Sequence, residues 1–180
     1  MNPSLPMKFC FNKCFRYTFA ILLTLLFIFQ AKTANYYVNP STGNDILSGT
    51  NSSNAFRTFH KAYTVAASGD FIYLSSGIID WTSGLETGDA GTDGYTISKN
   101  LTIIGNGSQN TFIQAASTRN TADRRVFTFS ANVTIKNLTI RYGKNTSTNG
   151  GGFYAASGSV TMDNVSVESN YCSSGGGQPT

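Results

Sequence analysis

The feature that most constrains the fold of this chain is a repeated block of sequence. The segment VTIKNLTI at residues 133–140 aligns without gaps on VTMDNVSV at residues 160–167, at an offset of 27 residues. Val126-Phe127 also lies 27 residues before Phe153-Tyr154, so the repeat is predicted to extend beyond one strand. A fixed period of roughly 20 to 50 residues is typical of solenoids and propellers, whose stacked units bury a core together.

Within each block, apolar residues alternate with Thr, Ser or Asn, which is the pattern of a strand with one buried face. We predict a unit of strand, turn, strand, two-residue turn and strand. Residues 95–114 fit this unit with an insertion at Gly105–Asn110, and residues 71–79 fit a first coil, meaning one complete turn of the solenoid. The register of residues 95–114 stays open, because Leu101 aligns with Val133 at an offset of 32 but KNLTI recurs at an offset of 37. About four coils are predicted in total.

Asn137 and Asn164 occupy equivalent positions between the strands of the two matched blocks. Asn tolerates the left-handed backbone of a sharp turn, and stacked Asn amides can form a hydrogen-bonded ladder. We favour this interpretation over glycosylation, although both residues stand in Asn-X-Ser/Thr sequons, as do Asn51, Asn100, Asn106, Asn132 and Asn145. The triplets at 150–152 and 175–177 are predicted corners, because glycine permits tight turns and close approach of coils.

The first 34 residues have the composition of a secretory signal peptide. Lys8, Lys13 and Arg16 precede the apolar run at residues 19–29, which is shorter than the roughly 20 residues that a membrane-spanning helix needs. A short membrane anchor is therefore the weaker interpretation. We predict removal of residues 1–34, although Lys32 occupies a position where a small residue is preferred. The mature protein is then expected to be secreted, extracellular or on the cell outer membrane surface.

Removal of this segment changes the charge and the cysteine content. Four of the 13 basic residues lie before Asn35, which leaves nine against nine acidic residues and a net charge of zero. A neutral surface lacks the basic patch of a nucleic-acid-binding protein, so nucleic acid is not an expected partner. Cys10 and Cys14 are also removed, so no intrachain disulfide is expected for Cys172.

Ahead of the repeats, residues 52–70 are predicted to form an amphipathic helix. Ser53 or Asn54 is the expected N-cap, and Gly69 is the expected end. The first coil of a solenoid exposes an apolar end, which we expect this helix to cover. One apolar face of the helix is predicted to contain Phe56, Phe59, Tyr63, Ala66 and Ala67.

The segments YYVNPSTGNDILSGT (36–50) and AFRTFHKAYTVAASGDFIYLSSG (55–77) resemble the opening of secreted right-handed parallel β-helix proteins, which are pectate-lyase-like. The later part resembles the polymorphic outer membrane protein repeat through GGGF (150–153) and VESN (167–170), where Val167 replaces the Phe of that motif. Together the resemblance covers about residues 36–177. In the opening segments, the matching elements are Tyr37-Val38, Gly43-Asn44-Asp45 and Gly69-Asp70.

This resemblance implies an all-β fold, a right-handed parallel β-helix with a short N-terminal capping helix. A signal peptide at 1–34 is then followed by a strand and the capping helix at 35–70 and by coils at 71–180. Because the last predicted coil has no cap, we expect the chain to be truncated at the C-terminus, as a fragment of a longer surface protein. Scaffolds of this kind host lyases, hydrolases and adhesins, so the resemblance does not select a chemistry.

The acidic cluster in ETGDAGTD is the one candidate for a cofactor-binding site, and the cofactor would be calcium. Glu86, Asp89 and Asp93 are weak calcium candidates, because their spacing could supply oxygen ligands. The favoured interpretation is a solvated loop inserted between coils, since the segment does not match a known calcium-binding loop. We predict no other metal site and no other cofactor.

No catalytic residue is predicted. Asp163 and Glu168 have no acidic equivalents 27 positions earlier, where Lys136 and Arg141 lie. Arg141 is a poor candidate for a lyase base, because the sequence places no acidic cluster beside it. His60 has no second His or Cys nearby with which to bind a metal.

Two further residues are open to more than one interpretation. Trp81 is either a platform for sugar stacking or a residue packed against the capping helix. Cys172 is predicted to be a small buried hydrophobic residue rather than a nucleophile.

Two functional hypotheses follow. The favoured one is a non-catalytic structural or adhesive module of a secreted or cell-surface protein, which binds extracellular polysaccharide or protein and can self-associate through its uncapped last coil. The alternative is the N-terminal part of a polysaccharide lyase or glycosidase that acts on acidic polysaccharide. The alternative predicts calcium binding by residues 86–93, or acids in further coils aligned with Asp163 or Glu168.

Overall fold

The computed structural model describes residues 32–88, 91–147 and 149–173. The chain divides into two compact units, Met1–Lys32 and Thr33–Thr180, and the fold lies in the second unit. Almost all of the predicted signal peptide and the whole second glycine triplet lie outside the described residues. Within the described ranges, no helix is long and apolar enough to cross a membrane.

Short strands dominate the described residues, with one α-helix among them. The helical segments are η1 (Ser52–Asn54), α2 (Phe59–Val65) and η2 (Gly91–Asp93). The strands are β1 (Asn35–Val38), β2 (Phe71–Leu74), β3 (Gly77–Asp80), β4 (Tyr95–Ile97), β5 (Leu101–Ile104), β6 (Thr111–Gln114), β7 (Phe127–Phe129), β8 (Val133–Arg141), β9 (Lys144–Asn145), β10 (Phe153–Ala155), β11 (Val160–Glu168) and β12 (Tyr171–Cys172).

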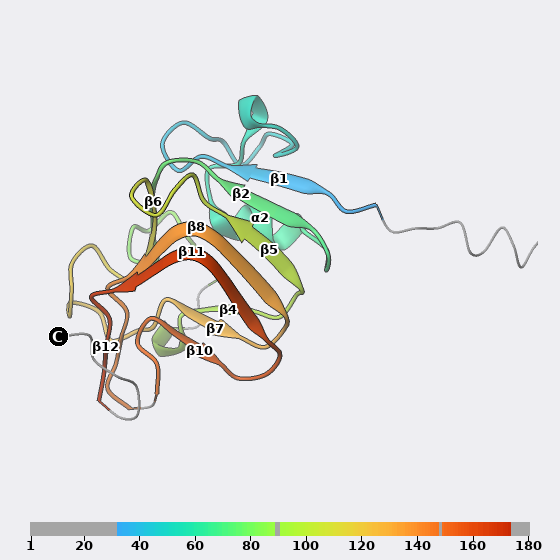
Figure 1. The fold of residues 1–180 in the computed structure, drawn as a ribbon. Helices are drawn as coiled ribbons and strands as arrows, with labels where there is room; N and C mark the ends of the chain where they lie inside the picture. The colour runs from blue at the N-terminus through green and yellow to red at the C-terminus, as the bar shows by residue number, and fades with distance from the viewer. Residues whose placement is uncertain (1–31, 89–90, 148, 174–180) are drawn as a thin grey trace, which may run out of the picture. The chain divides into compact units, whose positions relative to one another are not determined.

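These strands stack in parallel as the faces of a β-solenoid. Strands β1, β2, β5, β8 and β11 follow one another along one face. Strands β3 and β6 pair on a second face, where β6 also pairs with the second half of β8. A separate sheet has the order β10-β7-β4, and β9 pairs with β12. Figure 1 shows β8 and β11 lying side by side and bending together. The predicted all-β parallel solenoid with a short helix is confirmed.

The predicted offset of 27 residues is confirmed for β8 and β11, where Val133 pairs with Val160 and Ile140 with Val167. The register left open earlier is also settled. Leu101 pairs with Val133, so the offset of 32 holds for β5, whereas Ile113 on β6 pairs with Ile140. The loop between β5 and β6 contains the predicted insertion and absorbs the difference between the two offsets.

One predicted pairing is wrong by one residue. Phe127 pairs with Phe153, not with Tyr154. Phe127 is fully buried, and Phe153 packs against the same core, so both rings point inward. The turn from β10 to β11 is one residue longer than the turn from β7 to β8, and this restores the offset of 27 in the next strand pair.

A single asparagine bends each long strand. Asn137 and Asn164 have positive φ angles of 55° and 53°, and the residues on both sides of them stay paired. The predicted two-residue turn is therefore a one-residue bend. The Asn164 Nδ2 atom donates a hydrogen bond to Asn137 Oδ1 at 3.0 Å, which confirms the predicted ladder. Glycosylation of these sequons stays a prediction.

The helical segment is shorter than predicted. Helix α2 spans Phe59–Val65, and Thr58 caps it by accepting a hydrogen bond from the Lys61 backbone N–H. Phe56 cannot be helical, because its backbone N–H donates to Tyr37 and its carbonyl accepts from the Asn39 N–H. Gly49 and Phe56 therefore hydrogen-bond to the outer edge of β1, and η1 lies between them in the sequence. Ala67, predicted to face the core, is exposed.

The core beneath α2 is aromatic. Trp81 is 3% exposed, and its ring lies 5.9 Å from that of Phe59 on α2 and 5.1 Å from that of Tyr95. The Trp81 indole N–H donates to the Val126 carbonyl at 2.8 Å. Of the two interpretations of Trp81, packing against the capping helix is correct.

The first glycine triplet allows backbones of successive coils to touch. A Cβ atom at Gly151 would lie 2.0 Å from the Tyr171 carbonyl oxygen, and a Cβ atom at Gly143 would lie 2.0 Å from the Gly151 carbonyl oxygen. Gly150 has a φ angle of +74°, which a residue with a side chain rarely adopts. The predicted roles of this triplet, tight turning and close approach, are confirmed.

Candidate functional site

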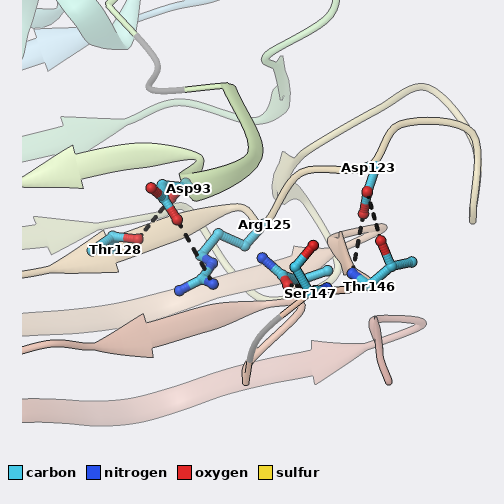
Figure 2. A network of polar contacts seen from close by, with 7 residues as sticks. Asp93, Asp123, Arg125, Thr128, Thr146 and Ser147 are labelled. Atoms are coloured by element: carbon cyan, nitrogen blue, oxygen red, sulfur yellow. Dashed lines mark hydrogen bonds and ion pairs between the residues drawn. The ribbon is translucent and has the colours of Figure 1, made fainter. Parts of the chain in front are cut away.

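The outer face of the β10-β7-β4 sheet carries a cavity of about 450 Å³. Its residues come from η2, the three strands, the segment before β7 and the loop before β10, as Figure 2 shows for part of them. They are Asp93, Thr96, Arg125, Thr128, Asn149 and Tyr154.

The register of the three strands determines which side chains form the floor of this cavity. Thr96 pairs with Thr128, and Thr128 pairs with Tyr154, so the three side chains form one row across the sheet. Their neighbours along each strand point the other way into the core, because side chains alternate between the two faces of a strand. Tyr95 and Phe127, for example, are at most 1% exposed. Tyr154 is 41% exposed and offers a ring to the solvent.

Arg125 is the anchor of the site. Its side chain is 2% exposed, and its guanidinium carbon lies 5.0 Å from the centroid of the Tyr154 ring. A guanidinium at this distance attracts the ring electrostatically and holds its orientation. Asp93 pairs with Arg125 across 3.8 Å, and its own side chain is 64% exposed. The carboxylate therefore stays open to hydrogen-bond donors in the cavity.

Hydrogen bonds fix the segments around the cavity, and Figure 2 shows those made by Thr128 and Thr146. The Thr128 hydroxyl donates to the Asp93 backbone carbonyl at 2.6 Å. The Arg125 backbone N–H donates to the Thr92 backbone carbonyl at 3.1 Å. Outside the lining residues, Asp123 accepts hydrogen bonds from the Thr146 backbone N–H and hydroxyl at 3.2 and 2.7 Å. This pair holds the start of the loop that supplies Asn149.

The predicted calcium candidates do not share one site in the structure. Asp93 lies in the cavity with Arg125, Asp89 lies outside the described residues, and Glu86 binds the start of α2. The described residues contain no group of three His, Cys, Asp or Glu side chains that could hold a metal ion. Calcium binding by this segment stays a prediction.

Glu86 acts as a cap for α2. Its two carboxylate oxygens accept hydrogen bonds from the Phe59 and His60 N–H groups at 2.8 and 3.0 Å. Burial raises the pKa of Glu86 to about 7, the two backbone hydrogen bonds oppose this shift, and the nearby Asp45 charge adds to it. The carboxylate is therefore partly protonated near neutral pH.

This arrangement predicts that acidification stabilises the fold. Between the ordinary pKa of 4.5 and about 7, folded Glu86 binds a proton that the unfolded chain does not bind. The free energy of unfolding should therefore fall as the pH rises from 5 to 8, by about 1–2 kcal/mol after allowance for partial solvent screening. Urea unfolding of the wild type and of Glu86→Gln across this range measures the effect. A wild-type curve that is flat or rising relative to Glu86→Gln would contradict the assignment.

The remaining sequence candidates have structural contacts. His60 Nδ1 lies 2.8 Å from the Tyr95 hydroxyl. Lys136 pairs with Asp163 at 3.2 Å, one coil apart. The Arg141 guanidinium lies 4.0 Å from the centroid of the Phe112 ring. Cys172 on β12 is half-buried, so it is less buried than predicted.

Sequence reasoning missed most of the cavity, since only Asp93 was a candidate. Arg125, Asn149 and Tyr154 stand in segments without a chemical motif. The one available signal is the alternation in YTI and FTF, which places Thr96 and Thr128 outward between buried residues.

Comparison with protein-family models and with curated proteins gives no match. Among solved structures, the chain is similar to a protein titled rhamnogalacturonan lyase, with 18% sequence identity and a TM-score of 0.44. The matched region covers 65% of this chain and 31% of that chain, so it spans less than a third of the length of that protein. A likeness of this strength assigns no activity.

Proposed function

We propose that this chain is a non-catalytic adhesive module of a secreted or cell-surface protein, and that it binds a neutral, hydroxyl-rich polysaccharide in the cavity on the β10-β7-β4 sheet. The observation that carries this proposal is the combination of an exposed tyrosine ring, an exposed carboxylate and a row of threonines around one cavity of about 450 Å³.

Each of these groups matches a feature of a sugar. The Tyr154 ring can stack on the apolar face of a pyranose, with Arg125 holding the ring from one side. Asp93 can accept hydrogen bonds from sugar hydroxyls, which are donors, while Thr96 and Asn149 can donate and accept. Sites of this kind combine a few oriented polar groups with an apolar or aromatic wall.

The charge of the cavity favours a neutral ligand over an acidic one. Asp93 and Arg125 are its only charged lining residues among those described, and they pair with each other. Because Arg125 is 2% exposed, its charge is directed at Asp93 and Tyr154 rather than at the solvent. The exposed charge that a ligand meets is the Asp93 carboxylate, which repels carboxylated sugars.

The same geometry gives little support to the enzyme alternative. A glycosidase of the usual kind needs two carboxyl groups that flank the scissile bond, and the described lining residues include one. A lyase needs a base that reaches the substrate, whereas Arg125 is buried and its guanidinium does not lose its proton in proteins.

Binding assays with the secreted chain test the proposal. Isothermal titration with neutral and acidic polysaccharides should show saturable binding to a neutral one. Tyr154→Ala should weaken this binding about tenfold or more, because it removes the stacking surface. Tyr73→Ala is the matched control, since Tyr73 is a partly exposed tyrosine on β2, outside the cavity.

Three results would count against the proposal. One is an equal loss of binding in both variants, and another is preferential binding of acidic polysaccharide. Release of shorter saccharides during the titration would favour the enzyme alternative instead. Unfolding curves for both variants establish that any loss of binding is not a loss of the fold.

A further inference from the structure

The start of β1 is attached to the buried carboxylate of Asp70. Asp70 is 5% exposed, and its two side-chain oxygens accept hydrogen bonds from the Ala34 and Ala67 backbone N–H groups, each at 2.7 Å. The Ala34 carbonyl accepts a hydrogen bond from the Phe71 N–H at 2.9 Å, immediately before the first register pair of β1 and β2. Ala34 is therefore held by both of its backbone polar groups and belongs to the folded part of the chain.

Asp70 is a buried acid without a cationic partner among the described residues. The hydrogen bonds to its carboxylate come from backbone N–H groups, and the ion pairs in the described ranges involve other acids. Buried carboxylates are usually paired with a positive charge, because burial penalises an uncompensated charge. The Ala34 nitrogen lies 2.7 Å from Asp70 Oδ1. If this nitrogen were a protonated α-amino group instead of an amide, it would supply the missing charge at hydrogen-bond distance.

The sequence before Ala34 fits the end of a secretory signal peptide. Small residues are preferred at the last and third-last positions of such a segment. If the signal peptide ends at residue 33, these positions hold Thr33 and Ala31, which both have short side chains. If it ends at Ala34, which is the boundary expected from the sequence, the third-last position holds Lys32. Cleavage there would also remove the residue whose N–H binds Asp70.

We propose that the signal peptide is cleaved between Thr33 and Ala34, and that the new α-amino group of Ala34 forms an ion pair with Asp70. Hydrolysis of this peptide bond consumes one water molecule and leaves a carboxylate on Thr33 and an ammonium group on Ala34. Cleavage therefore converts a neutral amide donor into a charged one, and charge-assisted hydrogen bonds are about twice as strong. Removal of the signal peptide thus strengthens the attachment of β1 to the first coil. The inference rests on the secretion stated in the proposed function.

N-terminal sequencing and the intact mass of the exported protein test the cleavage position. The full chain of 180 residues is expressed in a host with a secretory pathway and collected after export. The first residue should be Ala34. A first residue at Asn35, or at any position before Ala34, would overturn the inference but leave the proposed function intact. Retention of the uncleaved chain inside the cell would overturn both.

The reactivity of the α-amino group tests the ion pair separately. An amine reagent modifies the unprotonated amine, and a neighbouring carboxylate keeps an amine protonated. Near neutral pH, the α-amino group of the exported chain should therefore react about tenfold more slowly than that of an Asp70→Asn variant, as mass spectrometry of the N-terminal peptide measures. Asp123→Asn is the matched control and should react like the wild type. Asp123 also accepts a backbone N–H, from Thr146, but lies between β6 and β7 in the sequence.

Equal reaction rates in the wild type and in Asp70→Asn would overturn the ion pair, as would the same acceleration in both variants. Urea unfolding curves show whether Asp70→Asn keeps the fold. If it does not, the free peptide ANYYV, residues 34–38, replaces it as the reference. The exported chain should then react about tenfold more slowly than this peptide, because the peptide has the same α-amino group without Asp70. Equal rates in that comparison would also overturn the ion pair.

Discussion

Replacing Trp81 with alanine is expected to lower the free energy of unfolding by about 3–5 kcal/mol, which is the usual cost of emptying a buried tryptophan site. The Trp81 ring packs against Phe59, Tyr95 and Phe127, with centroids 5.1 to 5.9 Å away. Its removal would leave a cavity between the capping helix and two coils, although Phe59 still contacts Tyr95 and Phe127 directly. It would also leave the Val126 carbonyl without the indole N–H. Urea unfolding followed by far-ultraviolet circular dichroism measures the loss.

Trp81→Phe is the matched control, because it keeps an aromatic ring but has no N–H group. It should cost about 1–2 kcal/mol, for a lost hydrogen bond and a smaller ring. If Trp81→Ala unfolds within about 1 kcal/mol of the wild type, Trp81 does not anchor the cap to the coils.

Gly151→Ala is expected to cost about 2–3 kcal/mol, at the upper end of the cost of overpacking. The added Cβ would lie 2.0 Å from the Tyr171 carbonyl oxygen and 2.7 Å from the Tyr171 carbonyl carbon. Neither atom can move aside by side-chain rotation, so the coils themselves must separate. The strand pair β9–β12 should open first, because Tyr171 is part of β12. Thermal and urea unfolding of the variant measure the change.

Gly84→Ala is the matched control, because it distinguishes backbone strain at a positive φ angle from steric overlap with a neighbouring coil. Gly84 has a φ angle of +74° but nothing lies within 4 Å of its added Cβ, so alanine there costs about 1–2 kcal/mol of backbone strain alone. Gly151→Ala should be the more destabilising of the two. The opposite order would show that close approach between coils is not what selects glycine at position 151.

The stacking of β8 on β11 is predictable from sequence because apolar and polar residues alternate on each side of the central asparagine in both strands. A shift by one residue would turn all of these side chains to the solvent. The β7–β10 pairing is less well determined, because FTF and FYA are short and the turns beside them differ in length. Register then depends on which ring enters the core, and Phe153 does so instead of Tyr154.

The candidate site is predictable only in part. Asp93 belongs to an acidic cluster that suggests a calcium site in the sequence. In the structure it pairs with Arg125 from another coil. A buried arginine and an exposed tyrosine carry no local signal, since their burial depends on which segments the solenoid stacks. The helix shows the same limit. Its periodicity includes Phe56, but the edge of β1 holds that residue in an extended backbone.

A solenoid behaves as a one-dimensional array, in which each coil is held by its neighbours. The cavity spans three of these coils, since Thr96, Thr128 and Tyr154 lie on β4, β7 and β10. A ligand in the proposed site would therefore contact three coils at once and act as a clamp that opposes their separation.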